Sequence, residues 1–266
     1  MLIAGIDIGS GTTKAVLVDG DGMVRGRGLV RTKADFEKVT HEALAAATSD
    51  AAAAPGDVAY VATTGLGRYA VPFRDIQITD LTCGARGAAT LFPATHYVLD
   101  IGAQCSRAIK LRDGGKVKEF HMNEKCAAGS GGFLERAAKY LEVGLAEVGA
   151  LSLGAGRPQP ISSVCAVLAE SEIINHVSEG VGVENILRGI HNSLADRALS
   201  LLKRVGLDGE VTLIGGVALQ AGMVAALRDK LGVPVNVPDA PQHTTALGAA
   251  LLGLQRFRKL AAARAA

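Results

Sequence analysis

The sequence has no tryptophan, and only 4% of its residues are aromatic. It also has no excess of one charge, because 28 Lys and Arg residues stand against 26 Asp and Glu residues, which leaves a net charge of +2. A nucleic-acid-binding surface usually needs stacking side chains and a basic patch, and an acidic membrane attracts polybasic segments. The composition therefore predicts neither nucleic acid nor membrane as a partner.

Long apolar runs are missing as well, since none reaches the roughly 18 residues that a membrane-spanning helix needs. The opening segment MLIAGIDIGS contains Asp7 and lacks the basic region typical of a secretory signal. The four cysteines are too few and too scattered for a disulfide framework in a chain of 266 residues. We therefore expect a cytoplasmic protein whose thiols are reduced, some of them available to hold a metal.

What the sequence has in quantity is glycine, at 33 residues, within a composition that is 48% hydrophobic. Frequent glycine suits an α/β protein with many tight turns between strands and helices. The length predicts two domains or one large one, with enough chain to bury a substantial core.

An internal repeat supports two domains. The stretch DIGSGTTKAVLVDGDGMV from Asp7 aligns without a gap on DIGAQCSRAIKLRDGGKV from Asp100, so that Lys14 falls on Arg107. Each copy has the pattern of a strand, a tight turn, a second strand and a hairpin into a third. Such duplication predicts two similar halves.

Helical periodicity follows each copy of the repeat. Helices are expected at about residues 34–48, 131–142, 166–178 and 185–205, after the strand EVTLIGGVAL, and in the closing segment TTALGAALLGL. Gly206 is placed to end the fourth of these as a left-handed cap. The Ala-rich residues 51–54 look like a low-complexity segment, and the tail after Leu260 is expected to fray.

The first copy of the repeat contains the parts of a phosphate-binding loop. In GIDIGSGTTK an acid that can hold Mg²⁺ precedes glycines, hydroxyls and a lysine. The candidate ligands of a nucleotide here are Ser10, Gly11, Thr12, Thr13 and Lys14. One Gly-rich hairpin is structural more often than not, but the second copy and a later turn after a strand, at Gly215 and Gly216, favour a nucleotide.

These duplicated turns and the late Gly-Gly turn resemble the actin, hexokinase and Hsp70 superfamily. The resemblance implies an α/β fold of two ribonuclease H-like domains that bind ATP or ADP in an interdomain cleft, with Mg²⁺ near Asp7 and Asp100. The expected domains are residues 1–95 and 96–266, and the C-terminal helix can return to the first of them.

Two cysteines stand where helices are expected to begin: Cys126 before AAGSGGFLE, and Cys165 within ISSVCAVLAESEIIN. A helix N-terminus lowers the pKa of a thiol and stabilises an anion. An isolated cysteine is most often just a small buried residue. Two matched thiols are half of the set that a 4Fe-4S cluster takes, and a symmetric or pseudo-symmetric dimer would complete it.

The chain also resembles a narrower family, the ATPase activators of 2-hydroxyacyl-CoA dehydratases and the ATP-binding subunits of class I benzoyl-CoA reductases. The motifs that carry this resemblance are GIDIGSGTTK, LDIGAQ, NEKCAAGSGGFLE, SSVCAVLAESEIIN, GIHNSLADR, LIGGVA and ALGAA. It implies a 4Fe-4S cluster on Cys126 and Cys165, shared by two subunits. It also implies a nucleotide site that adds Gln104, Ala128, Gly129, Ser130, Gly131, Gly132 and Gln242 to the candidates above.

The family's function would make this chain an ATPase and an ATP-dependent oxidoreductase subunit. It would pass low-potential electrons from ferredoxin to a catalytic iron–sulfur component that acts on an acyl-CoA. Asp7 and Asp100 would organise Mg²⁺ and water, and Gln104 would position the attacking water. Cys105 follows Gln104 where activators usually carry Asp, so the chain looks more like the smaller reductase subunit, which pairs with a homologous subunit. The alternative is a homodimeric dehydratase activator.

A small-molecule kinase of the same fold is a more remote alternative, since a kinase needs no iron and this chain has little spare length for a substrate domain. The six histidines show no metal-binding spacing and are treated as ordinary residues. Cys83 and Cys105 are expected to be structural thiols. Glu170 and Glu172 are expected to be solvated or to face a partner.

Overall fold

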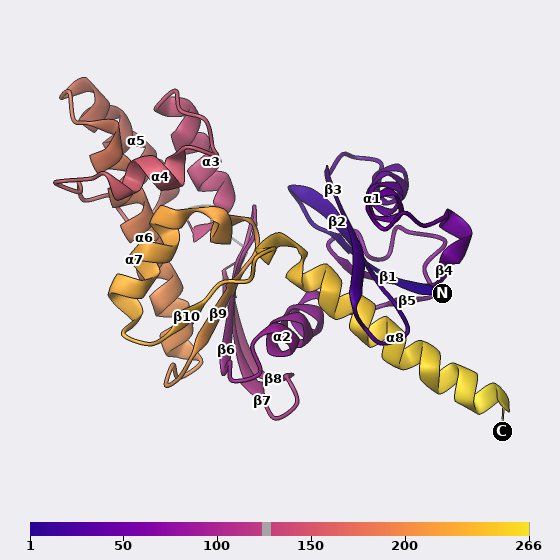
Figure 1. Cartoon of the computed structure of the whole chain (residues 1–266). Helices are drawn as coiled ribbons and strands as arrows, with labels where there is room; N and C mark the ends of the chain where they lie inside the picture. Colours follow the sequence, from indigo (N-terminus) through magenta and orange to yellow (C-terminus); the bar gives the residue numbers. More distant parts are fainter. Residues whose placement is uncertain (124–128, 266) are drawn as a thin grey trace. The chain divides into compact units, whose positions relative to one another are not determined.

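The computed structural model describes residues 1–123 and 129–265 and divides the chain into two compact units, each with its own five-stranded sheet (Figure 1). Unit 1 comprises Met1–Ala94, Leu111–Val117 and Gln242–Ala266. Unit 2 comprises Thr95–Lys110 and Lys118–Pro241. The first division, between Ala94 and Thr95, lies one residue before the expected boundary between residues 95 and 96. Unit 1 also includes the hairpin turn within Leu111–Val117 and the C-terminal helix.

The sheet of unit 1 has the strand order β3-β2-β1-β4-β5. Its strands are β1 (Leu2–Ile8), β2 (Thr12–Val18), β3 (Val24–Arg31), β4 (Val58–Gly65) and β5 (Ile76–Gln77). The first three form an antiparallel meander, and β4 lies parallel to β1. The helices of this unit are α1 (Phe36–Asp50), α2 (Asp80–Leu91) and α8 (Thr244–Ala265).

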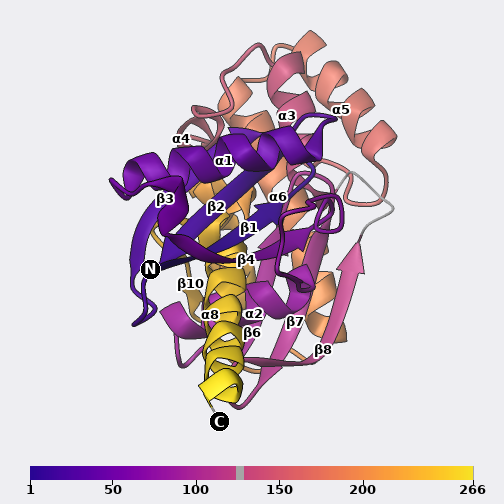
Figure 2. The same cartoon turned by 90° about the vertical axis from the view of Figure 1, so that its right-hand side faces the viewer.

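Both faces of this sheet are covered, which explains why β1 is buried along its whole length. Alternate side chains of β1, from Leu2 to Ile8, pack in one cluster with Ala43 and Ala47 of α1, and α1 crosses that face in Figure 2. Ile3 points the other way, into a cluster with α8. A side chain at Gly5 would meet the α8 backbone, 2.2 Å from the nitrogen of Ala250, so glycine is required for this approach.

The sheet of unit 2 repeats the plan of the first, with the order β10-β9-β6-β7-β8. Its strands are β6 (Tyr97–Ile101), β7 (Ser106–Arg112), β8 (Lys116–Asn123), β9 (Val211–Ile214) and β10 (Val235–Asn236). Asp7 pairs with Lys14 across β1 and β2, and Asp100 pairs with Arg107 across β6 and β7. The repeat predicted from the sequence is therefore confirmed to the residue.

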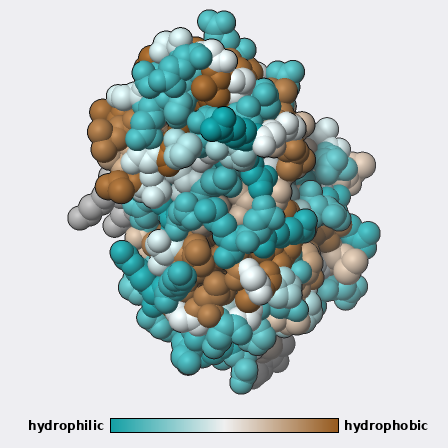
Figure 3. Space-filling view, turned by 90° about the vertical axis from the view of Figure 1, so that its left-hand side faces the viewer, coloured by the Kyte–Doolittle hydropathy of each residue, from teal (hydrophilic) through white to brown (hydrophobic). Residues whose placement is uncertain are grey.

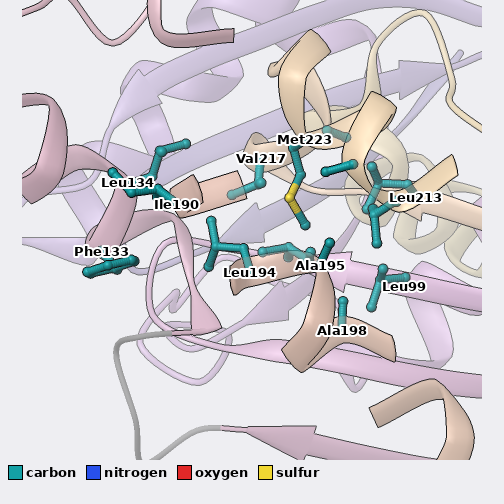
Figure 4. Packing of buried hydrophobic residues seen from close by; sticks show 14 of the residues in the cluster. Leu99, Phe133, Leu134, Ile190, Leu194, Ala195, Ala198, Leu213, Val217 and Met223 are labelled. Atoms are coloured by element: carbon teal, nitrogen blue, oxygen red, sulfur yellow. The ribbon is translucent and has the colours of Figure 1, made fainter. Parts of the chain in front are cut away.

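Unit 2 adds a set of helices. They are α3 (Gly131–Tyr140), α4 (Val148–Leu153), α5 (Ala166–Ser178), α6 (Val183–Arg204) and α7 (Ala221–Leu231), with a short 3₁₀ helix η3 (Gly216–Leu219). Side chains of α3, α6 and α7 meet those of β6 and β9 in the core of the unit (Figure 4). Gly206, at φ 71°, follows the end of α6 as the predicted left-handed cap.

Two features differ from the sequence expectation. Helices α2 and α4 were not predicted, and α8 continues past Leu260 to Ala265 instead of fraying. The tail has the sequence AAARAA, and alanine and arginine are strong helix formers, which accounts for the extension. None of the helices in the described part of the chain combines the length and apolarity that a membrane crossing requires.

Candidate functional site

Asp7 is held by a cation from the neighbouring strand. Lys14 Nζ lies 3.2 Å from Asp7 Oδ2, and the two side chains are only 14% and 11% exposed. The strand register places them opposite one another beside the turn of the first hairpin. A nearly buried carboxylate is tolerated in such a place because an ion pair offsets its lost hydration.

Asp100 has the same arrangement in the second unit. Arg107 Nη1 donates to Asp100 Oδ2 over 3.0 Å, with side-chain exposures of 16% and 14%. The internal repeat aligned these two pairs, but their ion pairing was not predicted. The sequence did contain a signal for this pairing, because an acidic and a basic residue at facing positions of a tight hairpin are placed to form an ion pair.

A glycine in the left-handed region crowds each carboxylate from the other side. Gly65 has φ 84°, and a Cβ there would lie 2.5 Å from Asp7 Oδ1. Gly215 has φ 91°, and its Cβ would lie 2.8 Å from Asp100 Oδ1. Gly215 was predicted from the sequence and Gly65 was missed, although Gly65 ends β4 in the segment TTGLG much as Gly215 follows β9 in the segment IGGVA.

Four of the five predicted ligands in the first hairpin, Ser10, Gly11, Thr12 and Lys14, are partly exposed. Thr13 is buried, and its hydroxyl lies 2.9 Å from that of Thr32. Thr32 in turn donates to Gly9 O and Gly11 O, so this pair of threonines fixes the turn. The Thr13 side chain thus shapes the loop.

In the second unit, Gln104 is exposed at the tip of the hairpin turn. The carbonyls behind it are occupied, because the N–H groups of Gly131 and Gly132 donate to Gly102 O and Ala103 O over 2.9 and 2.8 Å. A ligand at this loop would therefore have to use groups other than these two N–H donors.

The rest of this predicted loop is fixed in the same way. Ser106 Oγ donates to Gly129 O, and Ser130 is buried as the N-cap residue of α3. Ala128 lies outside the described residues.

The late glycine turn follows β9. Gly215 N donates to Pro241 O over 3.1 Å, and Gly216 begins η3. Gln242, the residue after Pro241, is partly exposed in a short 3₁₀ helix (Pro241–His243).

Cys165 is the N-cap residue of α5 and is partly buried. Backbone N–H groups of Leu168 and Val167, in the first turn of α5, hold the pKa of the Cys165 thiol below its ordinary value. The position predicted for this thiol is confirmed, and the physical cause is the expected one, unpaired donors at a helix start. An anionic sulfur at this position suits metal ligation.

The segment that leads to Cys165 is fixed by two neighbours. Glu172 Oε2 accepts a hydrogen bond from Ser162 N over 2.6 Å, and Ser193 Oγ of α6 donates to Ser162 O over 3.0 Å. Glu172 was expected to be solvated or to face a partner, and it instead holds its own chain.

The other cysteines divide clearly. Burial raises the pKa of the Cys83 thiol to about 12, which fits the structural role predicted for it. Cys105 is partly buried in the second hairpin turn. Cys126, the second predicted cluster ligand, lies outside the described residues. Within residues 1–123 and 129–265, no three His, Cys, Asp or Glu side chains group as a metal site.

Two surface hollows in the described part of the chain lie away from the candidate residues. One of about 410 Å³ lies between α8 and the Asp21 turn, and one of about 580 Å³ lies beside α7. Neither is lined by a residue predicted for nucleotide or metal. The face drawn in Figure 3 is largely hydrophilic, with separate hydrophobic patches.

Comparison with known proteins identifies the chain's relatives. A family model for the BadF/BadG/BcrA/BcrD ATPase family matches residues 4–253. The chain belongs to this family. Membership of an ATPase family supports ATP binding and ATP hydrolysis.

Two relatives cover nearly the whole chain. The D subunit of benzoyl-CoA reductase from Thauera aromatica is 43% identical over 272 residues, 98% of this chain and 95% of its own. The 2-hydroxyisocaproyl-CoA dehydratase activator of Clostridioides difficile is 40% identical over 266 residues, 97% of each chain. The resemblance predicted from the motifs is therefore confirmed, and it includes both branches.

Solved structures agree on the fold. The activator of the 2-hydroxyisocaproyl-CoA dehydratase from Clostridium difficile, with bound ADPNP, superposes with a TM-score of 0.93 at 37% identity, over 97% of this chain and 96% of that one. A ROK family glucokinase from Streptomyces griseus, at 17% identity, gives a TM-score of 0.58 over 96% of this chain and 100% of that one. The second likeness concerns the fold alone and supports the actin- and hexokinase-like class.

Proposed function

We propose that this chain is the ATP-hydrolysing electron-transfer subunit of a benzoyl-CoA reductase-type system. It would hold a 4Fe-4S cluster through Cys126 and Cys165, with two further thiols from a second subunit. The observation that carries the proposal is the position of Cys165. Cys165, whose thiol pKa is lowered by backbone N–H groups of Leu168 and Val167, is the N-cap residue of α5 in the same unit that holds the Asp100 turn, within a chain of an ATPase family.

The two hairpin turns fit a magnesium nucleotide. Each offers one carboxylate, held from the neighbouring strand by Lys14 or Arg107, and each has a glycine whose backbone packs closely against the other carboxylate oxygen. Bound ATP supplies phosphate oxygens for Mg²⁺ and a phosphoryl group for transfer to water. Asp7 and Asp100 would orient the waters of Mg²⁺, Lys14 would bind phosphate oxygens, and exposed Gln104 would position the attacking water.

Cys165, the proposed ligand that lies within the described residues, suits a 4Fe-4S cluster. A 4Fe-4S cluster supplies one-electron transfer at a potential set by its ligands, hydrogen bonds and exposure. Cys165 would bind it as a thiolate, and the first turn of α5 would direct N–H groups at the sulfur. Glu172 and Ser193 would keep the segment before Cys165 in place. Cys126 remains a prediction from the family resemblance.

The surface around Cys165 suits a partner subunit. Val164 is 81% exposed, Val167 69% and Leu168 55%, and all three lie within a few residues of the thiol. Contiguous exposed apolar side chains are typical of protein interfaces. A homologous ATPase subunit, or a second copy of this chain, would cover these side chains and bring its own cysteines to the cluster.

The names of the relatives support a catalytic partner component, and ferredoxin as the donor is what the family resemblance implies. The benzoyl-CoA reductase subunit and the dehydratase activator both serve a component that acts on a CoA thioester. We propose a catalytic iron–sulfur component of this kind as the electron acceptor and reduced ferredoxin as the donor.

Replacing the sulfur of Cys165 with oxygen tests the proposed cluster ligand. Cys165→Ser in the full chain, purified without oxygen together with its partner subunit, should lower iron content by most of a cluster and remove its absorption. Cys105→Ser is the matched control, because Cys105 is also partly buried in unit 2 and is not a proposed ligand. Full iron content in Cys165→Ser would end the cluster assignment.

A homodimeric dehydratase activator is the second candidate, favoured by the TM-score of 0.93 to such a protein. The subunit composition of the purified complex distinguishes the reductase subunit from the activator. Copurification of a larger homologous ATPase with further iron–sulfur subunits would support the reductase, and a dimer of this chain alone would support the activator.

A further inference from the structure

Glu170 connects two helices of unit 2 that the sequence alone left unrelated. Its Oε1 accepts a hydrogen bond from Arg136 Nε of α3 over 2.7 Å, and its Oε2 accepts one from Tyr140 OH over 3.3 Å. Glu170 itself lies in the first half of α5, and its side chain is 22% exposed. Both oxygens of one carboxylate thus bind α3, although this residue was expected to be solvated or partner-facing.

At its other end, α3 is attached to the Asp100 hairpin. The N–H groups of Gly131 and Gly132 in its first turn donate to the carbonyls of Gly102 and Ala103, as described above. A Cβ at Gly132 would lie 2.8 Å from Ala103 O, so the helix start and the turn are in direct contact. Any displacement of the turn that precedes Gln104 must therefore move α3 or break these bonds.

At its own start, α5 carries Cys165. Since α5 is a regular helix from Ala166 to Ser178, Glu170 and its N-cap residue move as one body. A continuous series of contacts consequently runs from the Asp100 turn through α3, the Arg136–Glu170 ion pair and α5 to Cys165. Backbone hydrogen bonds connect the Asp100 turn to α3, and the helix backbone connects Glu170 to Cys165. The connection between α3 and α5 includes the Arg136–Glu170 ion pair, which side-chain substitutions can remove.

We propose that Arg136 and Glu170 are positioning residues that transmit the nucleotide state of the Asp100 turn to the helix of Cys165. The proposal rests on the proposed function for its nucleotide, and it names the side chains through which ATP would act on the thiol. Tyr140 is the auxiliary member, because it binds the second oxygen of Glu170 at a longer distance.

Hydrogen–deuterium exchange on the full chain, purified without oxygen, tests this with and without MgADPNP. In the wild type, nucleotide should change exchange in peptides from both α3 and α5. In Arg136→Gln and Glu170→Gln, the change in α3 should persist, while the change in α5 should fall by about fivefold, the lower end of typical coupling factors. A purely structural role would alter exchange in α5 equally with and without nucleotide.

Arg188→Gln is the matched control. Arg188 Nη2 makes a 2.5 Å ion pair with Asp229 Oδ2, which joins α6 to α7 instead of α3 to α5. This variant should keep the wild-type response in both peptides. The double exchange Arg136→Glu with Glu170→Arg should restore part of the α5 response.

An α5 response that persists in both single variants, or is absent from the wild type, would overturn the inference. These outcomes are independent of iron content, because exchange is read from backbone amides. If Cys165→Ser keeps its iron, the proposed function fails while the coupling between α3 and α5 can still hold.

Discussion

The two sheets share a plan, but what separates their third and fourth strands differs. In unit 1, α1 and a single short turn lie between β3, which ends at Arg31, and β4, which begins at Val58. In unit 2, α3 to α6 lie between β8, which ends at Asn123, and β9, which begins at Val211. Both proposed cluster cysteines fall in this added segment. The shared strands therefore carry the carboxylate turns, and the added segment of unit 2 contains both proposed cluster ligands.

If the two turns do equivalent work, losing either carboxylate should be equally harmful. Asp7→Asn and Asp100→Asn should each reduce kcat for ATP hydrolysis by about 10²–10⁴-fold, the usual range for a group that organises proton transfer. Steady-state phosphate release measures this. A loss confined to one variant would show that the duplication has left one turn with a structural role only.

The added helices should also make stability depend on pH through His191 of α6. Its Nδ1 lies 2.8 Å from Ser152 Oγ of α4, and burial lowers its pKa from 6.5 to about 4. The unfolded chain therefore binds more protons than the folded chain between these values, and stability falls as pH decreases through them. The expected loss is about 3 kcal/mol.

Chemical denaturation of wild type and His191→Asn across this pH range isolates the effect, because asparagine can still donate to Ser152. Burial also lowers the pKa of His243 in unit 1, so the difference between the two proteins is the informative quantity. If the free energy of unfolding had the same pH dependence in the wild type and in His191→Asn, His191 would be excluded as the source of the acid destabilisation.

The same comparison shows what a single sequence can reveal. The repeat was detectable because Asp-x-Gly turns and strand alternation are local patterns, and Cys165 was placed correctly because helix starts have local signals. Gly65 was missed because its constraint comes from Asp7, far away in sequence. The partners of Glu170 were missed for the same reason, since Arg136 and Tyr140 approach it only after α3 and α5 have packed.

Gly65 and Gly215 test whether the backbone packs against Asp7 and Asp100 in the same way in the two units. Gly65→Ala and Gly215→Ala should each cost about 1–3 kcal/mol of stability, from a left-handed backbone and a Cβ that clashes with Ile8 or Ile101. Gly180→Ala is the control, because Gly180 has φ 74° with no atom within 4 Å of its Cβ. Equal losses in all three would mean that the backbone conformation alone, without the carboxylate contact, sets the cost.

The smallest effect concerns the cation beside each carboxylate, which is lysine in the first turn and arginine in the second. Lys14→Arg and Arg107→Lys each keep a cation beside the carboxylate, so stability should change by no more than about 1 kcal/mol. Lysine offers a single compact charge that can turn toward a phosphate, whereas the planar guanidinium of Arg107 donates through Nη1 to Asp100. We therefore expect Lys14→Arg to raise KM for ATP more than Arg107→Lys does, by less than about tenfold. The reverse order would mean that the second turn, despite its arginine, makes the stronger phosphate contact, and that the roles of the two hairpins must be exchanged.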